Sequence, residues 1–430
     1  MIEQISRARG IHGSIAVPGD KSISHRYAML ASIAQGSSRI YNFSTGADCH
    51  STLACMGALG IGHEFSSEDG RDILTIHGKG MRGLRAADRV LDAGNSGSTI
   101  RMLSGILAGQ QFRSILAGDE SLSKRPMRRI MTPLEAMGAR IQATNGQYPP
   151  ITISGGELRP IAYETPVASA QVKSCVLLAG LYAAGETSVR EPVQTRDHTE
   201  IALRELGADI TVQPRFVRLR GPAELKARDL AVPGDLSSAA FFLAAALLVP
   251  NSELIVSGVG LNPTRTALLD VLRGMGAAIR VLHVEERNGE MIGTLEARTS
   301  ALKGGVIEGA TTAAVIDEIP ILSVLGAVSA EGLKVRDAGE LRIKETDRIE
   351  TIARNLRAMK VAVETTADGL DIPGKQRFQA AHIESMGDHR IAMAFSIAAL
   401  LAEGTTYIHE AQAASVSFPE FYNTLRGLTQ

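Results

Sequence analysis

Cations and small polar residues gather in one short segment near the start of the chain, VPGDKSISHR at 17–26. Lys21, Ser22, His25 and Arg26 lie there between a strand-like run and an apolar helical stretch. A helix start exposes unpaired backbone N–H groups and the positive end of the helix dipole, which suits an anion. We therefore predict that this segment binds a phosphate or a similar anion.

The segment has a second copy, VPGDLSSAAFFLAAALLV at 232–249. This copy keeps Val-Pro-Gly-Asp, a Ser and the apolar helix, but it lacks the Lys, His and Arg. The contrast indicates that the first copy is chemical and the second structural.

Similar residues gather at four other places, namely 92–101 (DAGNSGSTIR), 118–129 (GDESLSKRPMRR), 169–174 (SAQVKS), and the pair 342–348 (RIKETDR) with 387–390 (GDHR). The first opens an apolar helix and suits an anion, although a turn with a Ser or Thr cap is the alternative. The second fits a phosphate or carboxylate clamp better than a solvated face or a nucleic-acid patch, because it has no interleaved aromatics. The third is weak alone, because Ser and Gln near helix starts are usually caps.

Within the fourth cluster, Lys344 and Arg348 are spaced as i, i+4 neighbours on a helix. Their like charges repel unless an anion lies between them, and a mixed-charge exposed helix is the alternative. Asp317 and Glu318 follow an apolar run and precede a Pro, so they are acid/base candidates or a plain helix cap. The GxGxxG match at 78–83 has no clear helix after it and no acidic residue about 20 positions on, which disfavours a dinucleotide site.

The elements that position these residues recur along the chain. The pattern Leu-x-x-Met/Leu, usually followed by Gly-Ala and a β-branched run, occurs six times, at LACMGA 53–58, LEAMGA 134–139, LRELGA 203–208, LRGMGA 272–277, LRAMKV 356–361 and LRGL 425–428. Each copy predicts a helix with an apolar i, i+3 pair, a Gly at its C-terminal end, and then a strand. Six α/β or α+β units result, three in each of two domains.

Composition describes a packed globule of 430 residues with 44% hydrophobic and 21% charged residues, long enough for two domains. The net charge of −1 argues against a nucleic-acid or membrane surface for the whole protein. Cys49, Cys55 and Cys175 have no metal-ligand spacing, so we expect unpaired thiols in a reducing compartment. No secretory signal is visible at the N-terminus, and we expect a cytoplasmic protein.

Taken in order, the motifs PGDKSISHR, GNSGSTIR, GDESLSKRPM, SAQVKS, LRIKETDR and GDHRIAM resemble those of the 5-enolpyruvylshikimate-3-phosphate synthases, within the enolpyruvyl transferases. The resemblance covers essentially the whole chain. It implies an inside-out α/β barrel fold of two similar domains, each with three βαβαββ repeats. By that analogy one domain spans 20–235, and the other joins 1–19 to 236–430.

The resemblance also implies a reaction. The enolpyruvyl group of phosphoenolpyruvate moves to the 5-hydroxyl of shikimate 3-phosphate through a tetrahedral intermediate, and phosphate is released. No metal or organic cofactor is needed, and neither a nucleic acid nor a membrane is a partner. We expect a monomer. Because both substrates carry phosphate and carboxylate groups, a site rich in Lys and Arg follows.

Residue roles are carried over by motif. The residues implied for shikimate 3-phosphate are Lys21, Ser22, Arg26, Ser169, Ala170, Gln171, Arg196, Asp317 and Lys344. Those implied for phosphoenolpyruvate are Lys21, Asn95, Gly97, Arg125, Gln171, Arg348 and Arg390. Asp317 is expected to take the 5-hydroxyl proton, and either Glu345 or Lys21 to handle the methylene proton.

Two features depart from some family members. A Lys shortly before the C-terminal Phe-Pro is replaced in AASVSFP at 413–419, so no role is carried over there. Met102 after Arg101, together with the SAQVK motif, resembles the second class of the family, whose members are often less sensitive to glyphosate. We expect reduced sensitivity here.

Two other functions are less consistent with the sequence. The sister enzyme that acts on UDP-N-acetylglucosamine typically has a Cys in the loop equivalent to 118–127, where this chain has none. A non-enzymatic repeat scaffold that binds phosphorylated ligands or nucleic acid is disfavoured by the near-neutral charge and the missing aromatic platforms.

Overall fold

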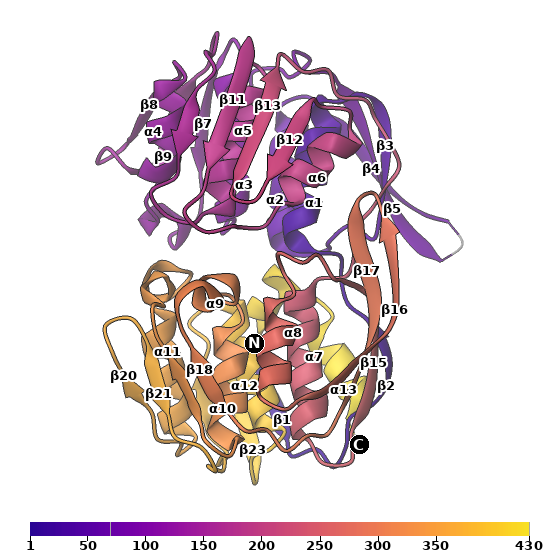
Figure 1. Cartoon of the computed structure of the whole chain (residues 1–430), viewed down its shortest axis with the longest axis vertical. Coiled ribbons are helices and arrows are strands. Elements are labelled where there is room, and N and C mark those ends of the chain that lie inside the picture. Colours follow the sequence, from indigo (N-terminus) through magenta and orange to yellow (C-terminus); the bar gives the residue numbers. More distant parts are fainter. Residues whose placement is uncertain (69, 430) are drawn as a thin grey trace. The chain divides into compact units, whose positions relative to one another are not determined.

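The structure, a computed structural model, describes residues 1–68 and 70–429. The chain forms two compact units (Figure 1): unit 1 comprises 1–18, 233–286 and 291–430, and unit 2 comprises 19–232 and 287–290. Each unit has its own hydrophobic core. The sequence placed the passages between domains at 19/20 and 235/236, and it gave no sign that 287–290 packs with unit 2.

Unit 2 is built from three successive groups of helices and strands. The first contains α1 (Lys21–Ile33), β3 (Gln35–Tyr41), α2 (Ala47–Ala58), β4 (Gly62–Glu68), β5 (Arg71–Lys79) and the later β14 (Leu230–Ala231). The second contains β6 (Leu91–Asp92), α3 (Gly97–Ala108), β7 (Arg113–Ala117), the 3-10 helix η1 (Leu122–Lys124), α4 (Arg128–Ala136), β8 (Arg140–Thr144) and β9 (Tyr148–Ser154). The third contains β10 (Ala162–Glu164), α5 (Ala170–Gly180), β11 (Gly185–Arg190), α6 (His198–Glu205), β12 (Ile210–Gln213) and β13 (Phe216–Gly221).

Each group folds into the same four-stranded sheet. The strand orders are β14-β3-β5-β4, β6-β7-β9-β8 and β10-β11-β13-β12, with the first pair parallel and the other pairs antiparallel. In the first group the opening strand, β14, comes from the end of the unit, so the chain leaves unit 2 beside its entry point. The βαβαββ repeat predicted from the sequence is therefore confirmed.

Unit 1 repeats the plan with one difference, because in the described residues its third sheet has three strands rather than four. Its first group contains β2 (His12–Ala16), α7 (Leu236–Leu248), β15 (Glu253–Gly260), α8 (Ala267–Gly274), β16 (Ala278–Arg287) and β17 (Glu290–Arg298). Its second contains β18 (Gly305–Ile307), α9 (Gly309–Ala314), α10 (Ile319–Val328), β19 (Leu333–Val335), η2 (Gly339–Ile343), α11 (Arg348–Ala358), β20 (Glu364–Thr365) and β21 (Leu370–Ile372). Its third contains β22 (His382–Glu384), α12 (His389–Ala399), β23 (Thr405–His409), η3 (Ala411–Val416), α13 (Phe421–Leu428) and the N-terminal β1 (Ile2–Ser6).

One helix of each repeat is almost wholly buried, namely α1, α3, α5, α7, α10 and α12. α7 shows why, because every residue from Leu236 to Leu247 is buried and none is charged. Its Phe241 and Phe242 pack against the rings of Phe418 and Phe421. Burying each such side chain stabilises the fold by about 2 kcal/mol. A helix with apolar residues on every side has no face suited to water, so it lies in the interior of its unit.

The predicted Gly-terminated helix ends are confirmed at three copies. Gly138, Gly207 and Gly276 have φ of +110°, +94° and +89° after α4, α6 and α8, and Lys360 (φ +63°) takes the same place after α11. At the first copy the prediction was wrong. Gly57 lies inside α2, and the left-handed residue is Gly60, one turn further on.

The two VPGD segments start equivalent helices. The side chain of Asp20 accepts a hydrogen bond from the Ile23 amide (2.9 Å), and Asp235 accepts one from the Ser237 amide (2.8 Å). A Cβ on Gly19 would lie 1.8 Å from the carbonyl oxygen of Asn42, so only Gly fits there. Local capping and close backbone approach account for the duplicated motif.

All three cysteines are buried and free. Over residues 1–68 and 70–429, helices that combine the length and apolar character needed to cross a membrane are absent.

Candidate active site

The cations of unit 2 gather at the starts of the central helices α1, α3 and α5. Lys21 Nζ lies 2.9 Å from Asp48 Oδ2. Gln171, at the start of α5, accepts a hydrogen bond from Arg101 (2.7 Å) and donates one to Ser98 (3.0 Å) on α3. Three helix starts therefore supply N–H groups and positive dipole ends beside the cationic side chains.

Arg26 is a buried cation of this cluster, at 4% exposure. Its guanidinium donates to Thr199 Oγ1 (2.6 Å), to Ser174 Oγ (2.8 Å) and to the Ser22 carbonyl (2.8 Å). Burial lowers the pKa of Arg26 to about 10, against the raising effect of Glu200, so it stays protonated at neutral pH. Arg196 lies 3.5 Å from the Ser22 hydroxyl. Ser169 caps α5 by accepting a hydrogen bond from the Val172 amide (3.4 Å). It therefore has the role of a helix cap, which the sequence offered as the usual one for a Ser at this place.

A second group surrounds the start of α3. Arg125 donates to Asn95 Oδ1 (2.8 Å), and Asn95 donates to Asp119 (2.7 Å). A Cβ on Gly97 would lie 2.7 Å from a terminal nitrogen of Arg101 and 3.7 Å from one of Arg125. Gly97 therefore leaves room for two guanidinium groups to approach the helix start.

His25 is a structural member of the segment. It is fully buried, and its Nδ1 lies 2.7 Å from Thr52 Oγ1, which in turn lies 2.7 Å from Thr99 Oγ1. Thr99 also donates to Ser96 (2.8 Å), the cap of α3. This chain of hydrogen bonds ties α1, α2 and α3 together.

Unit 1 carries a cluster at the starts of α10, α11 and α12. Arg348 is only 1% exposed, and it contacts Asp388 (2.8 Å), Glu345 (2.6 Å) and Asp317 (3.6 Å). Burial alone would lower the pKa of Arg348, but these carboxylates outweigh it and raise the pKa. Arg390 donates to the Asp317 carbonyl (3.0 Å).

Two sequence-based interpretations change in this cluster. Lys344 is not helical, because α11 begins at Arg348 with Asp347 as its cap. Lys344 and Arg348 instead approach one carboxylate, Asp317 Oδ1, at 3.4 and 3.6 Å. Glu318 is 3% exposed and bonded to Ser237 and Arg390, so it acts as a structural partner.

The second VPGD copy is structural, as the sequence indicated. At the start of α7, Arg265 donates to Ser237 (2.6 Å) and lies 3.8 Å from Asp235. The start of α7 is therefore occupied by a guanidinium of the protein itself, that of Arg265, which is 7% exposed.

Sequence reasoning missed the residues that hold the cations in place. Asp48, Ser174, Thr199 and Asp388 make the contacts given above. Ser174 and Asp388 lie in the predicted segments 169–174 and 387–390 but had no role assigned, and Asp48 and Thr199 lie outside those segments. Their partners lie 27 or more residues away, which only the fold reveals.

Sheets wrapped around buried helices, in units of three repeats, define the enolpyruvyl transferase class of folds. The enolpyruvyl transferase NikO from Streptomyces tendae shares this fold, with a TM-score of 0.75 at 17% identity over 99% of this chain and 97% of that one.

The family is shown by closer comparisons. The EPSP synthase (3-phosphoshikimate 1-carboxyvinyltransferase) family profile matches residues 5–425. A 3-phosphoshikimate 1-carboxyvinyltransferase from Solibacter usitatus is 61% identical over all of both chains, and one from Koribacter versatilis is 52% identical over 99% of each. A solved EPSP synthase from Acinetobacter baumannii has a TM-score of 0.87 at 41% identity, over 100% of this chain and 98% of that one.

The chain belongs to the EPSP synthase family. It is an enzyme that transfers the enolpyruvyl group of phosphoenolpyruvate to the 5-hydroxyl of shikimate 3-phosphate in the shikimate pathway to aromatic amino acids. The UDP-N-acetylglucosamine alternative is not favoured.

Proposed function

We propose a division of labour among the clustered residues. The cluster of unit 2 binds the phosphate of shikimate 3-phosphate through Lys21, Ser22, Arg26, Ser169, Ala170, Gln171 and Arg196. The observation that carries this proposal is the joint start of α1 and α5, where backbone N–H groups and the Arg26 guanidinium come together. Asp317 and Lys344 complete the contacts to this substrate.

Phosphoenolpyruvate is assigned to a second set, namely Lys21, Asn95, Gly97, Arg125, Gln171, Arg348 and Arg390. Support comes from the close approach of Arg125 to Asn95 and Gly97, which gives a small space flanked by donors. Arg suits this role because its planar fork matches a carboxylate or phosphate in two hydrogen bonds.

In the proposed chemistry, the 5-hydroxyl oxygen of shikimate 3-phosphate bonds to C2 of phosphoenolpyruvate. The hydroxyl proton goes to Asp317, and C3 gains a proton to become a methyl group, giving a tetrahedral intermediate. In the second step the methyl group loses a proton, the C2–C3 double bond re-forms, and phosphate leaves. Lys21, Lys344 and the arginines balance the charge of the departing phosphate.

The Asp317→Asn variant tests the proposed base. Removing a positioned base typically lowers the rate by 10²–10⁴-fold, so we expect kcat to fall on that order while the KM of phosphoenolpyruvate changes less. Phosphate release with shikimate 3-phosphate as acceptor gives both constants. Asp337→Asn, at an exposed carboxylate of unit 1, serves as the control. Near-normal kcat in Asp317→Asn would remove Asp317 from the mechanism.

The methylene proton is assigned to Glu345, with Lys21 as the second candidate. Proton transfer to C3 and back exchanges deuterium from solvent into the methylene group, which mass spectrometry of recovered phosphoenolpyruvate detects. For each variant, the exchange rate is compared with the loss of substrate binding. On that scale we expect Glu345→Gln to slow the exchange far more than Lys21→Met does. The reverse ranking would transfer the role to Lys21.

We further propose that the enzyme acts as a monomer in the cytoplasm, without nucleic acid or membrane partners. The net charge of −1 supports the last point. Light scattering that gives a mass well above 45.6 kDa would contradict the monomer.

A further inference from the structure

Glu318 is a buried carboxylate that the proposed reaction does not use. It directly follows Asp317 and precedes α10, and it is 3% exposed. A buried carboxylate needs charged or hydrogen-bonding partners. The partners of Glu318 come from three separate places in unit 1, namely Ser237 on α7, Arg265 shortly before α8, and Arg390 on α12. Glu318 therefore connects α10 with segments that lie far from it in the sequence.

The two successive carboxylates contact different cations. Asp317 Oδ1 lies 3.4 Å from Lys344 and 3.6 Å from Arg348. Glu318 Oε1 instead lies 3.6 Å from Arg390 Nη1. Glu318 is thus the carboxylate that pairs with Arg390, the residue assigned above to phosphoenolpyruvate.

Glu318 is itself held in place by a chain of buried polar groups. The Ser237 hydroxyl donates to Glu318 Oε1 and accepts a hydrogen bond from Arg265 Nη2 (2.6 Å). Asp235 accepts from the Ser237 amide (2.8 Å) and lies 3.8 Å from Arg265. The Arg265 amide in turn bonds to the Asn262 carbonyl (2.8 Å). Buried hydrogen-bond networks of this kind fix a side chain in one arrangement.

Arg390 is anchored through one nitrogen only. Its Nη1 donates to the Asp317 carbonyl (3.0 Å) and is the atom that approaches Glu318. Among the residues that the structure describes, none accepts a hydrogen bond from Nε or Nη2 of Arg390. These two nitrogens form the edge of the guanidinium that can bind a carboxylate or a phosphate with two parallel hydrogen bonds. Holding Nη1 therefore orients the edge that remains for a ligand.

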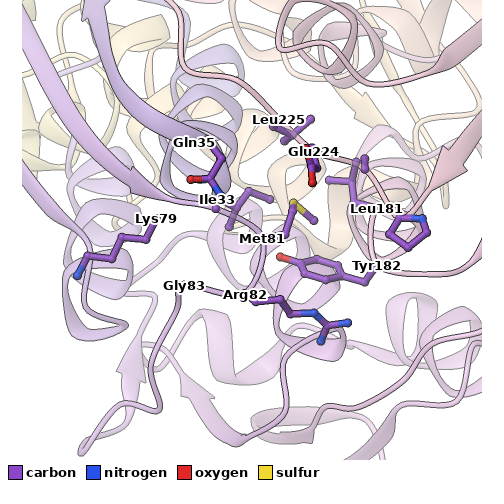
Figure 2. A pocket seen from close by; sticks show the side chains of 13 residues that line it. Ile33, Gln35, Lys79, Met81, Arg82, Gly83, Leu181, Tyr182, Glu224 and Leu225 are labelled. Atoms are coloured by element: carbon purple, nitrogen blue, oxygen red, sulfur yellow. The ribbon is translucent and has the colours of Figure 1, made fainter.

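The cavity of about 430 Å³ in unit 2 (Figure 2) lacks this arrangement. Its Arg82 donates to the Gly109 carbonyl after α3 (2.7 Å), and the guanidinium lies over the Tyr182 ring, 5.6 Å from the ring centre. Within residues 1–68 and 70–429, no carboxylate forms an ion pair with Arg82. Arg82 therefore stabilises the end of a helix and is not held ready for a ligand.

We propose that Glu318 is a positioning residue for phosphoenolpyruvate. It holds Arg390 so that the Nε and Nη2 edge is oriented before the substrate binds, while Ser237 and Arg265 hold Glu318. A guanidinium that is ordered in advance loses less side-chain entropy on binding, which strengthens binding. The role rests on the proposed binding of phosphoenolpyruvate by Arg390.

Steady-state kinetics of Glu318→Gln in the full-length enzyme test the proposal. The Gln side chain keeps the shape and can still accept from Ser237, but it removes the charge that faces Arg390. We expect the KM of phosphoenolpyruvate to rise about tenfold, while kcat and the KM of shikimate 3-phosphate change by less than about twofold.

Glu296→Gln is the matched control. Glu296 is 6% exposed and is also shared by two arginines, Arg280 (2.8 Å) and Arg298 (3.1 Å), but these belong to the hairpin of β16 and β17. Both KM values should stay unchanged in this variant.

Two further variants separate positioning from a general structural role. Arg390→Gln should raise the KM of phosphoenolpyruvate on the order of 100-fold, because it removes two charge-assisted hydrogen bonds. Adding Glu318→Gln to Arg390→Gln should then raise this KM no further, since no guanidinium remains to be oriented. Ser237→Ala keeps the charge of Glu318 but loosens it, and it should raise the same KM about threefold. This variant also decides the question if Glu318→Gln folds poorly.

The outcomes distinguish the two levels of the proposal. A normal KM of phosphoenolpyruvate in Arg390→Gln would overturn the assignment of Arg390 and the positioning role with it. A raised KM in Arg390→Gln, together with a normal KM in Glu318→Gln or, where that variant does not fold, in Ser237→Ala, would overturn the positioning role alone. Equal rises of both KM values in Glu318→Gln, or a further rise in the double variant, would also overturn it.

Discussion

At the scale of single residues, His25 shows how a motif can mix chemical and structural members. It lies one position before Arg26, but its ring is fully buried and bonded to Thr52. Burial, reinforced by the charges of Lys21 and Arg26 and opposed by Asp20, lowers the pKa of His25 to about 3. The side chain is therefore neutral at neutral pH and remains so well below it.

This shift predicts a pH dependence of stability. An unfolded His takes up a proton below about pH 6.5, whereas the folded one resists until about pH 3. The contribution of His25 to the free energy of unfolding is therefore complete above pH 6.5. It falls by about 1.4 kcal/mol per pH unit as the pH decreases toward 3. His25→Asn should lower stability at pH 7 yet flatten the decline between pH 6 and 4.5, as measured by urea unfolding.

The exposed His50 on α2 provides the matched control, since His50→Asn should leave the pH profile unchanged. A His25→Asn profile parallel to the wild-type profile would show that other groups cause the acid loss.

At the scale of elements, Lys173 holds two segments together beside the cations at the starts of α1 and α5. Its ammonium is 2.8 Å from Glu191 and 2.7 Å from Glu200, and all three side chains are about 3% exposed. Burial lowers the pKa of Lys173, but the two carboxylates outweigh it and raise the pKa. Glu200 follows Thr199, the acceptor for Arg26, so the ion pair fixes the turn of α6 that positions the guanidinium.

We predict that Lys173→Met destabilises the protein by about 3–5 kcal/mol, because it leaves buried carboxylates without their cation. The KM of shikimate 3-phosphate should rise while that of phosphoenolpyruvate changes little, since Arg26 loses its support. Steady-state kinetics and urea unfolding measure the two effects.

A triple variant, Lys173→Met with Glu191→Gln and Glu200→Gln, removes the stranded charges and should recover most of the stability. Lys226→Met, at an exposed position, is the control. Equal changes in both KM values would indicate a general loss of folding and contradict the positioning role.

Helix boundaries show the limit of local patterns at this scale. The sequence places a helix end at Gly57, but α2 continues to Ala58 and the left-handed residue is Gly60. The amide of Ile61 bonds to the Met56 carbonyl (3.0 Å), as the amide of Ala139 bonds to that of Leu134 (3.0 Å). Gly57 and Gly60 are both suited to a helix end, and the structure uses Gly60.

At the scale of the whole molecule, the chain connects the two units at more places than the sequence suggested. The strands β16 and β17 belong mostly to unit 1, but the turn 287–290 packs with unit 2. Glu290 Oε1 lies 2.6 Å from His198 Nδ1, with 1% and 2% of the two side chains exposed. Asn288 also accepts a hydrogen bond from the Ala231 amide (2.9 Å).

We predict that Glu290→Gln weakens this docking by about 1–3 kcal/mol, because it replaces a hydrogen bond to a charged group with a neutral one. Hydrogen exchange followed by mass spectrometry should then show faster exchange in 287–290 and in α6. Glu286→Gln, at an exposed position in the same hairpin, should leave exchange unchanged. Unaltered exchange in Glu290→Gln would show that other contacts hold the turn.

Local chemistry in the sequence determined much of this protein. Helix caps such as Asp20 and Asp235, the recurring helix ends, and the ordered Lys and Arg motifs are encoded within a few residues, so their spacing predicted the repeat, the α/β class and the phosphate chemistry. The asymmetry between the two VPGD copies was readable in the same way.

Only the tertiary structure decided which groups meet. Asp317 between Lys344 and Arg348, Lys173 between two glutamates, and Glu290 against His198 are contacts across 18 to 92 residues. Burial sets the pKa of a group and its need for a partner, and burial depends on the whole packed core rather than on neighbours in sequence.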